Sequence, residues 1–174
     1  MSNEIEITHS NQCPENFHGI WIALLHARRI PPHIGLIFNN SYSSLNIKGK
    51  EIDIQTEILS KTILRQKTEV LFFKIMQHPV FSINYLHENF LLHLDKYEKV
   101  MGIESTCFGP IRDFFSENYH LEKNKMKFLP DLFPELFLNQ FILSTHSVNL
   151  TENTFLLEKY DEVKLHIELQ KLKY

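Results

Sequence analysis

The sequence predicts a single α+β domain, in which a mainly antiparallel sheet of five or six strands carries three or four packed helices. Two kinds of segment lead to this prediction. Short apolar and aromatic runs bounded by Pro, Gly or Asn have the length of strands, and longer stretches carry apolar residues at helical spacing. The chain has 174 residues. That length suits one sizeable core and is short for two, so residues 1–174 are taken as one domain.

Composition and charge restrict the function. Apolar residues make up 43% of the chain and charged residues 22%, as in folded soluble domains. A formal net charge of −3 gives no reason to expect a nucleic-acid partner. We expect no transmembrane segment and a cytoplasmic protein, since no apolar run is long enough to span a bilayer and the first residues do not resemble a secretory signal. The five glycines are scattered, so no phosphate loop and no cofactor are expected.

The chain begins with an edge strand and then a segment of ambiguous type. Residues 4–8 alternate apolar and polar side chains, which favours a short strand. Residues 17–25 fit either an apolar helical stripe or a buried strand, and periodicity does not separate the two. The prolines at 31 and 32 end this segment in both cases.

A hairpin follows the two prolines. Regular strand pairing begins at or after His33, because proline lacks the backbone donor that a ladder needs. The strand continues to Phe38, turns at residues 39–41, which tolerate turn geometry, and returns over residues 42–47. His33 is thereby fixed at the opening of a strand.

The next two elements are a short helix and a central strand. Asp53 or Thr56 is a candidate cap for a helix that extends to about Ile63. Residues 69–76 are rich in apolar and aromatic side chains and have strand length, so they are assigned to the middle of the sheet.

Two helices are predicted after this strand. Ser82 caps the first, whose apolar spacing continues to Met101 and ends at Gly102. The second lies within residues 104–115 and has Pro110 in its first turn. Cys107 therefore lies at or just before a helix N-terminus.

The last elements are a polar connection over residues 121–128, a helix and a hairpin. The helix starts near Asp131 with Pro134 in its first turn. Its apolar face, from Leu132 to Leu143, is a candidate surface for a protein partner or a lipid-like ligand, although burial in the core is favoured. Residues 155–160 and 163–172 are predicted to form a terminal hairpin that closes the sheet.

Cys107 and His33 are the candidate catalytic residues. The first turn of a helix lowers the pKa of a thiol, because unpaired N–H groups and the macrodipole favour the thiolate. A rigidly held histidine at a strand opening suits a general base, and the N–H of Cys107 suits an oxyanion donor. Asn46 or Ser44, on the return strand, would orient the imidazole.

This order of parts resembles the circularly permuted papain-like enzymes, among them the lecithin–retinol acyltransferase-like group. The resemblance covers roughly residues 21–115 and rests on the Pro-His-Ile-Gly-Leu-Ile-Phe strand, its return strand and a later cysteine that opens a helix. It implies a permuted papain-like fold and a cysteine hydrolase or acyltransferase acting on an amide, peptide or lipid-like acyl substrate. His33 matches the family's base and Cys107 its nucleophile.

The match has gaps, and alternatives remain. Family members often have Asn before the cysteine and a second histidine on the return strand, where this chain has Thr106 and Leu45, so the third role is open. Cys13, if it opens a helix, would restore the order of papain itself, but only twenty positions separate it from His33. No histidine spacing predicts a metal site. The alternative function is a non-catalytic protein-interaction module.

Overall fold

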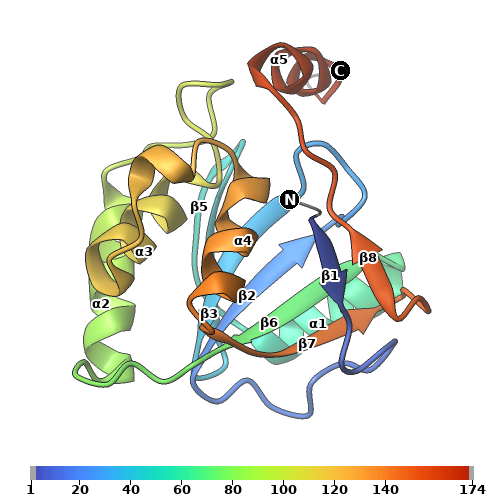
Figure 1. Cartoon of the computed structure of the whole chain (residues 1–174), viewed down its shortest axis with the longest axis vertical. Coiled ribbons are helices and arrows are strands. Elements are labelled where there is room, and N and C mark those ends of the chain that lie inside the picture. The colour runs from blue at the N-terminus through green and yellow to red at the C-terminus, as the bar shows by residue number, and fades with distance from the viewer. Residues whose placement is uncertain (1–2, 173–174) are drawn as a thin grey trace.

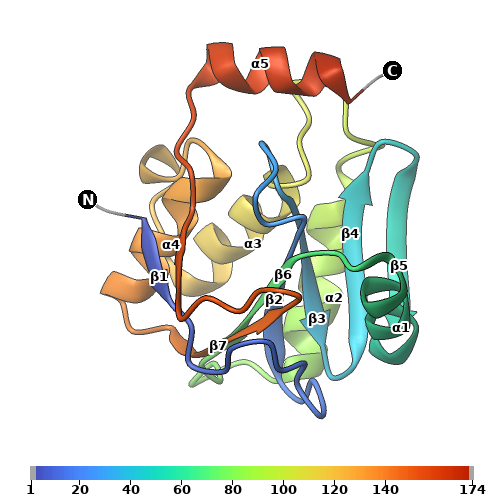
Figure 2. The same ribbon diagram turned by 90° about the vertical axis from the view of Figure 1, so that its right-hand side faces the viewer.

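The computed structural model describes residues 3–172 and contains a six-stranded antiparallel sheet with helices on both faces (Figures 1 and 2). The strand order is β5-β4-β3-β2-β6-β7. The strands are β2 (Ile20–Leu25), β3 (His33–Phe38), β4 (Ser41–Asn46), β5 (Gly49–Gln55), β6 (Val70–Ile75) and β7 (Ile142–Val148). A separate two-stranded sheet pairs β1 (Glu4–Glu6) with β8 (Thr154–Leu156). The α+β class predicted from the sequence is confirmed.

The ambiguous segment at 17–25 is a strand in its second half. β2 lies between β3 and β6, and all but its last residue are buried. A strand covered on both faces reads as a continuous apolar run, which explains why periodicity did not identify it. Leu25 pairs with His33, so His33 opens β3 beside the end of β2.

The helices divide between the two faces of the sheet. They are α1 (Thr56–Gln66), α2 (Ile83–Asp95), α3 (Gly109–Tyr119), α4 (Leu129–Leu138) and α5 (Glu162–Lys171), with a 3-10 turn at Lys123–Lys125. Side chains of α2, α3 and α4 share the larger core with Ile34 and Leu36. Side chains of α1 share the smaller core with Trp21, Ile37 and Tyr42. Alternate residues of β3 therefore point to opposite cores.

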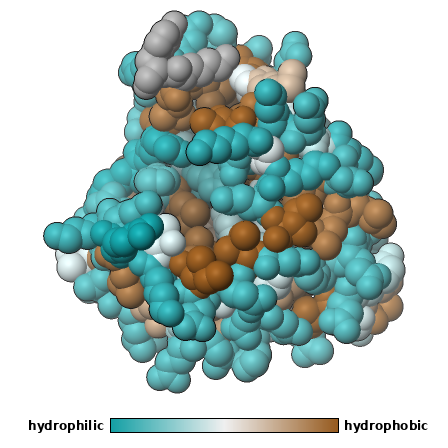
Figure 3. Space-filling model, turned by 180° about the vertical axis from the view of Figure 1, so that it is seen from behind, coloured by the Kyte–Doolittle hydropathy of each residue, from teal (hydrophilic) through white to brown (hydrophobic). Residues whose placement is uncertain are grey.

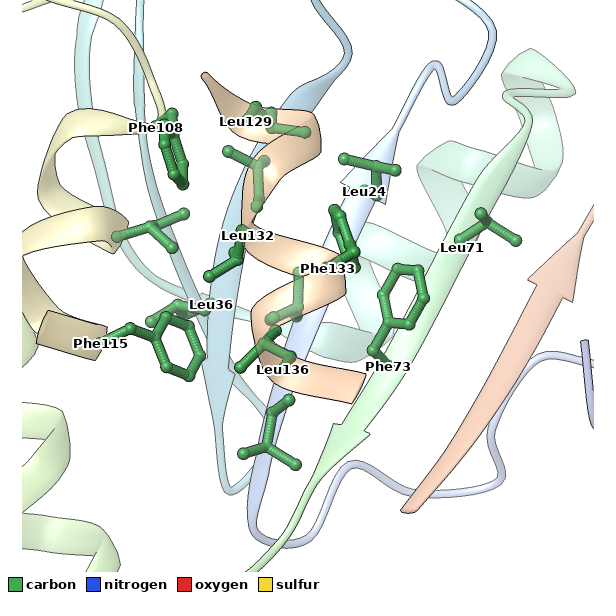
Figure 4. Packing of buried hydrophobic residues seen from close by; sticks show 14 of the residues in the cluster. Leu24, Leu36, Leu71, Phe73, Phe108, Phe115, Leu129, Leu132, Phe133 and Leu136 are labelled. Atoms are coloured by element: carbon green, nitrogen blue, oxygen red, sulfur yellow. The ribbon is translucent and has the colours of Figure 1, made fainter. Parts of the chain in front are cut away.

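The apolar face of α4 is part of the larger core. Leu132, Phe133 and Leu136 are at most 1% exposed. Figure 4 shows these side chains between α3 and the sheet, with the Phe133 and Phe73 ring centroids 4.6 Å apart. Of the candidate partner surface, Leu138 and Leu143 are largely exposed. The back of the molecule is mostly hydrophilic, with a hydrophobic patch across its middle (Figure 3).

The predicted terminal hairpin is wrong. Glu162–Lys171 forms helix α5, and residues 154–156 pair with β1 instead. Asp161 caps the helix, because its carboxylate accepts the backbone N–H of Lys164 at 2.8 Å. Leu165 and Leu169 lie one helical turn apart and are buried together, and this spacing matters more than the alternation that suggested a strand.

Two helices are shorter than predicted. α2 ends at Asp95, and the following Tyr97 turns toward α3, where its hydroxyl donates to Asp113 at 2.8 Å. Gly102, with φ 65°, lies in a turn in which Met101 N–H donates to the carbonyl of Ser105. α4 ends at Leu138, because Gln140 is left-handed (φ 57°) and residues 142–148 pair with β6.

Candidate functional site

His33 is held by a hydrogen-bonded chain that runs across three neighbouring strands. Its Nε2 lies 3.0 Å from the hydroxyl of Ser44 on β4. Ser44 in turn donates to Glu51 Oε2 on β5 at 3.0 Å, and the two residues are cross-strand partners. This chain fixes the orientation of the imidazole ring.

The same contacts define the tautomer of the neutral ring. A hydroxyl carries one proton, and Ser44 gives its proton to the carboxylate of Glu51. The oxygen of Ser44 therefore accepts from Nε2–H of His33. Nδ1 then carries the lone pair and is the nitrogen that can act as a base.

Burial keeps His33 uncharged. Desolvation lowers the pKa of His33 to about 4, and the nearby Arg29 guanidinium and His26 add to this effect. The ring is thus neutral at neutral pH. A neutral imidazole is the form that accepts a proton in general-base catalysis.

Cys107 lies two residues before α3, with its thiol against the first residues of β3. Its Sγ is 3.8 Å from the carbonyl oxygen of Pro32, in the geometry of a weak S–H donor. The residue is 7% exposed. The nucleophile predicted from sequence therefore packs beside the backbone that leads into His33.

The pKa of the Cys107 thiol is shifted in the direction opposite to the one predicted from the sequence. Burial raises the pKa of the Cys107 thiol, and this effect outweighs the backbone N–H groups and the Arg29 charge, which act in the opposite sense. The thiol is protonated at neutral pH. The lowered pKa that the helix N-terminus suggested is not found, because desolvation penalises the thiolate more than the first turn favours it.

The candidate residues share the wall of one cavity of about 370 Å³, but among residues 3–172 no hydrogen bond joins Cys107 to His33: the thiol donates to the Pro32 carbonyl in the larger core, and Nε2 of His33 is hydrogen-bonded to Ser44. Cys107, His33 and Asn46 all contribute to the wall of this cavity, together with Glu51 and Arg29. The side chain of Asn46 is engaged elsewhere, since its Oδ1 accepts the backbone N–H groups of Lys48 (2.8 Å) and Gly49 (3.1 Å) in the hairpin turn. Of the two residues considered for orienting the imidazole, Ser44 is the one that contacts it.

Cys107 also lines a second cavity, of about 230 Å³, on the side of α3 and α4. The walls of this cavity include Tyr97, Phe128 and Arg112. The thiol therefore lies where two cavities approach each other.

Helix α5 contributes to both cavities that contain Cys107. Leu165 lines the smaller one, and Leu169 and Leu172 line the larger one. Figures 1 and 2 show α5 lying across one end of the molecule, joined to β8 by an extended segment. The only described ion pair between α5 and a residue before position 150 joins Glu162 and Lys127 at 3.8 Å.

Cys13 lies far from His33. Its thiol is 3.7 Å from Ser60 of α1, and it lines a cavity with Asn40, just beyond the far end of β3. At ~3.3 Å per residue along a strand, Asn40 and His33 are roughly 20 Å apart. The papain-like order that would use Cys13 is not assembled.

Sequence reasoning missed Glu51 and Arg29. Glu51 could have been found, because a hairpin turn at residues 46–49 places residue 51 opposite Ser44. Arg29 carries no local signal. Its contribution depends on the path of the chain between β2 and β3, which brings its charge near Cys107.

We compared the chain with protein-family models, with curated proteins and with solved structures. None of them matches it. Within residues 3–172, no group of three or more His, Cys, Asp or Glu side chains is arranged to hold a metal ion. None of the helices described is both long enough and apolar enough to cross a bilayer.

Proposed function

We propose that this chain is a cysteine-dependent hydrolase or acyltransferase that acts on an amide, peptide or other acyl substrate. Cys107 is the nucleophile, His33 is the general base, and Ser44 with Glu51 orients the imidazole. The observation that supports this most is the cavity shared by Cys107 and His33, which come from distant parts of the sequence.

The reaction starts from a neutral thiol and a neutral imidazole. Nδ1 of His33 takes the thiol proton while the sulfur of Cys107 bonds to the carbonyl carbon, and the carbonyl π electrons move to oxygen. The backbone N–H groups of Cys107 and Phe108, which lie near the sulfur, are suited to stabilise this oxyanion. Proton transfer accompanies attack, since no thiolate–imidazolium pair exists beforehand.

The remaining steps regenerate the thiol. The tetrahedral intermediate collapses, the bond to the leaving group breaks, and that group takes the proton from the imidazolium of His33. Water, or an acceptor alcohol or amine, then attacks the thioester while His33 accepts its proton. When the bond to sulfur breaks, the proton returns to Cys107 and the acyl product leaves.

Burial of the thiol favours a second candidate function. With Cys107 only 7% exposed and its pKa raised, the chain also has the properties of a non-catalytic interaction module with a structural cysteine. In that case Phe137, Leu138 and Leu143, the exposed large apolar residues of the candidate partner surface, would be the residues to examine.

Activity assays with matched variants separate the two candidates. The purified chain is screened against activated esters, thioesters and peptide amides, and any activity is retested in Cys107→Ala, His33→Ala and Cys13→Ala. We expect loss with Cys107→Ala, a fall of about 10²–10⁴-fold with His33→Ala, and full activity with Cys13→Ala. Mass spectrometry should find the acyl group on Cys107. Activity that survives Cys107→Ala would exclude the proposal, and inertness of the native chain across the panel would favour the module.

A further inference from the structure

The 230 Å³ cavity beside Cys107 has a positive side chain, Arg112, that forms no ion pair within 4.0 Å among the described residues, although its charge acts on the adjacent Asp113 and its guanidinium interacts with the Tyr97 hydroxyl. Arg112, on α3, contributes to the cavity wall, and the Nε of this side chain is buried without a hydrogen-bond acceptor. Asp113, the adjacent carboxylate, is occupied by Lys123 and by the hydroxyl of Tyr97, each at 2.8 Å. Among residues 3–172, no carboxylate oxygen lies within 4.0 Å of the Arg112 guanidinium.

The other charges of the cavity do not replace this missing partner. Lys127 and Glu162 face each other at 3.8 Å, so they largely offset one another. Glu104 also contributes to the wall, but it is an exposed residue. A partly buried guanidinium without a carboxylate is a strong potential donor, because a hydrogen bond between charged groups contributes more than one between neutral groups.

The size and lining of the cavity limit what it accepts. Its volume of about 230 Å³ lies below the range of about 300–1,000 Å³ typical of pockets for drug-sized ligands. The aromatic rings of Tyr97, Phe108 and Phe128 and the side chain of Leu129 line it. A short acyl group fits such a cavity, and a long lipid chain does not.

We propose that this cavity is the acyl subsite of the enzyme, and that it takes a short acyl group ending in a carboxylate that pairs with Arg112. The inference rests on the proposed function, because it assigns the acyl group to one side of Cys107. The leaving group or acceptor then occupies the larger cavity, where His33 lies. The substrate class is accordingly the amide, ester or thioester of a short dicarboxylic acid.

Alkylation of Cys107 tests the subsite without requiring turnover. The thiolate displaces iodide from iodoacetate or iodoacetamide, so an S–C bond forms as the C–I bond breaks, and only the charge of the reagent differs. A second pair, maleimidopropionic acid and N-ethylmaleimide, places the carboxylate farther from sulfur. Rates at Cys107 and at Cys13 are measured at one mildly alkaline pH by peptide mass spectrometry. We expect the anionic reagent of at least one pair to be favoured at Cys107 relative to Cys13.

Four variants identify the residue responsible for that preference. Arg112→Gln should lower the ratio of anionic to neutral rates at Cys107 about tenfold, the size of one hydrogen bond to a charged group, and Arg112→Lys should recover part of it. Lys127→Gln, in the same cavity, and Arg29→Gln, in the larger cavity, should leave the ratio within about twofold. Circular dichroism spectra check that each variant is folded.

The outcomes for the subsite and for the enzyme are separable. The subsite proposal is overturned if neither anionic reagent is favoured at Cys107, or if the preference follows Arg29 or Lys127 instead of Arg112. Turnover of neutral esters that depends on Cys107 would then still support the enzyme. Conversely, an Arg112-dependent preference in a chain without turnover would support the anion site alone.

Discussion

The two ring nitrogens of His33 have different roles. Nε2 is hydrogen-bonded to Ser44, and Nδ1 is the nitrogen that would accept a proton in the proposed reaction. Nε2 is tied through Ser44 to Glu51, while burial keeps the whole ring neutral above about pH 4. A surface histidine would be partly charged near pH 6.5. Across the neutral range the ring is therefore unprotonated, and the same lowered pKa makes it a weaker proton acceptor than a surface imidazole.

The buried, neutral state of His33 should make stability depend on pH. The folded pKa of about 4 lies below the unfolded value of about 6.5, so the unfolded chain binds more protons between these values. Stability is then full above pH 6.5 and falls as the pH drops through 4, by up to about 3 kcal/mol. His33→Gln should flatten this part of the curve, measured by urea unfolding at a series of pH values.

A surface histidine provides the control. His18 is exposed, so His18→Gln should leave the slope between pH 6.5 and 4 unchanged. If His33→Gln and the native chain lose stability in parallel over this range, the ring is not held in its neutral form.

Among the single elements, the β3–β4–β5 meander is the part of the site that could be predicted best from the sequence. The prolines before His33 and the turn residues at 39–41 determine where β3 begins and ends. The return strand then brings Ser44 beside β3, and the next turn brings Glu51 beside Ser44. These are local consequences of strand pairing, and they account for the orientation of the imidazole.

Other features could not be derived from local pattern. The acidity of the Cys107 thiol depends on how completely α3 and β3 enclose it, which is a property of the packed molecule. The type of α5 is ambiguous in the sequence, because Leu165, Ile167 and Leu169 satisfy a strand pattern while Asp161 is a helix cap. The role of Arg112 depends on which carboxylates other cations occupy.

Gly35 couples two strands of the meander. A Cβ at this position would lie 2.4 Å from Cε2 of Tyr42, so the ring of Tyr42 rests directly on the glycine backbone. Gly35→Ala should destabilise the fold by about 1–3 kcal/mol through overpacking, measured by chemical denaturation. The same substitution should also disturb the contact between His33 and Ser44, because Gly35 is two residues from His33 on β3 and pairs with Ser44 on β4.

A double variant separates overpacking from other effects of the alanine. Tyr42→Leu removes the aromatic ring, so Gly35→Ala should cost much less in that background. Equal costs in both backgrounds would mean that the ring contact is not the cause.

For the molecule as a whole, we expect the position of α5 to limit access to the thiol. The helix contributes to both cavities around Cys107, yet its attachment is small, since only Leu165 and Leu169 of the helix are buried. Burying a leucine contributes about 1.5–3 kcal/mol. The energy that holds α5 in place is thus a few kcal/mol.

Weakening this attachment should expose Cys107. The double variant Leu165→Ser/Leu169→Ser is expected to raise the iodoacetamide labelling rate of Cys107 at least tenfold, while that of Cys13 stays the same. Val163→Ser/Ile167→Ser is the matched control, because it makes the same kind of change at residues 68% and 48% exposed. The readout is peptide mass spectrometry over time.

The control variant also sets the limit of this prediction. A similar gain in both double variants would mean that loss of helicity, and not loss of the buried contacts, controls access. No gain in either would mean that reagents reach the thiol by a path that avoids α5.

The placement of Leu172 in the wall of the larger cavity has a practical consequence for anyone who produces this protein. A polypeptide fused behind this helix, such as an affinity tag or a fluorescent protein, would follow a residue that lines the cavity we propose for the leaving group or acceptor. An inactive preparation carrying such an extension would say little about the chemistry of the thiol. Fusions placed ahead of β1 avoid the difficulty, because residues 4–6 pair with β8 and contribute to neither cavity around Cys107.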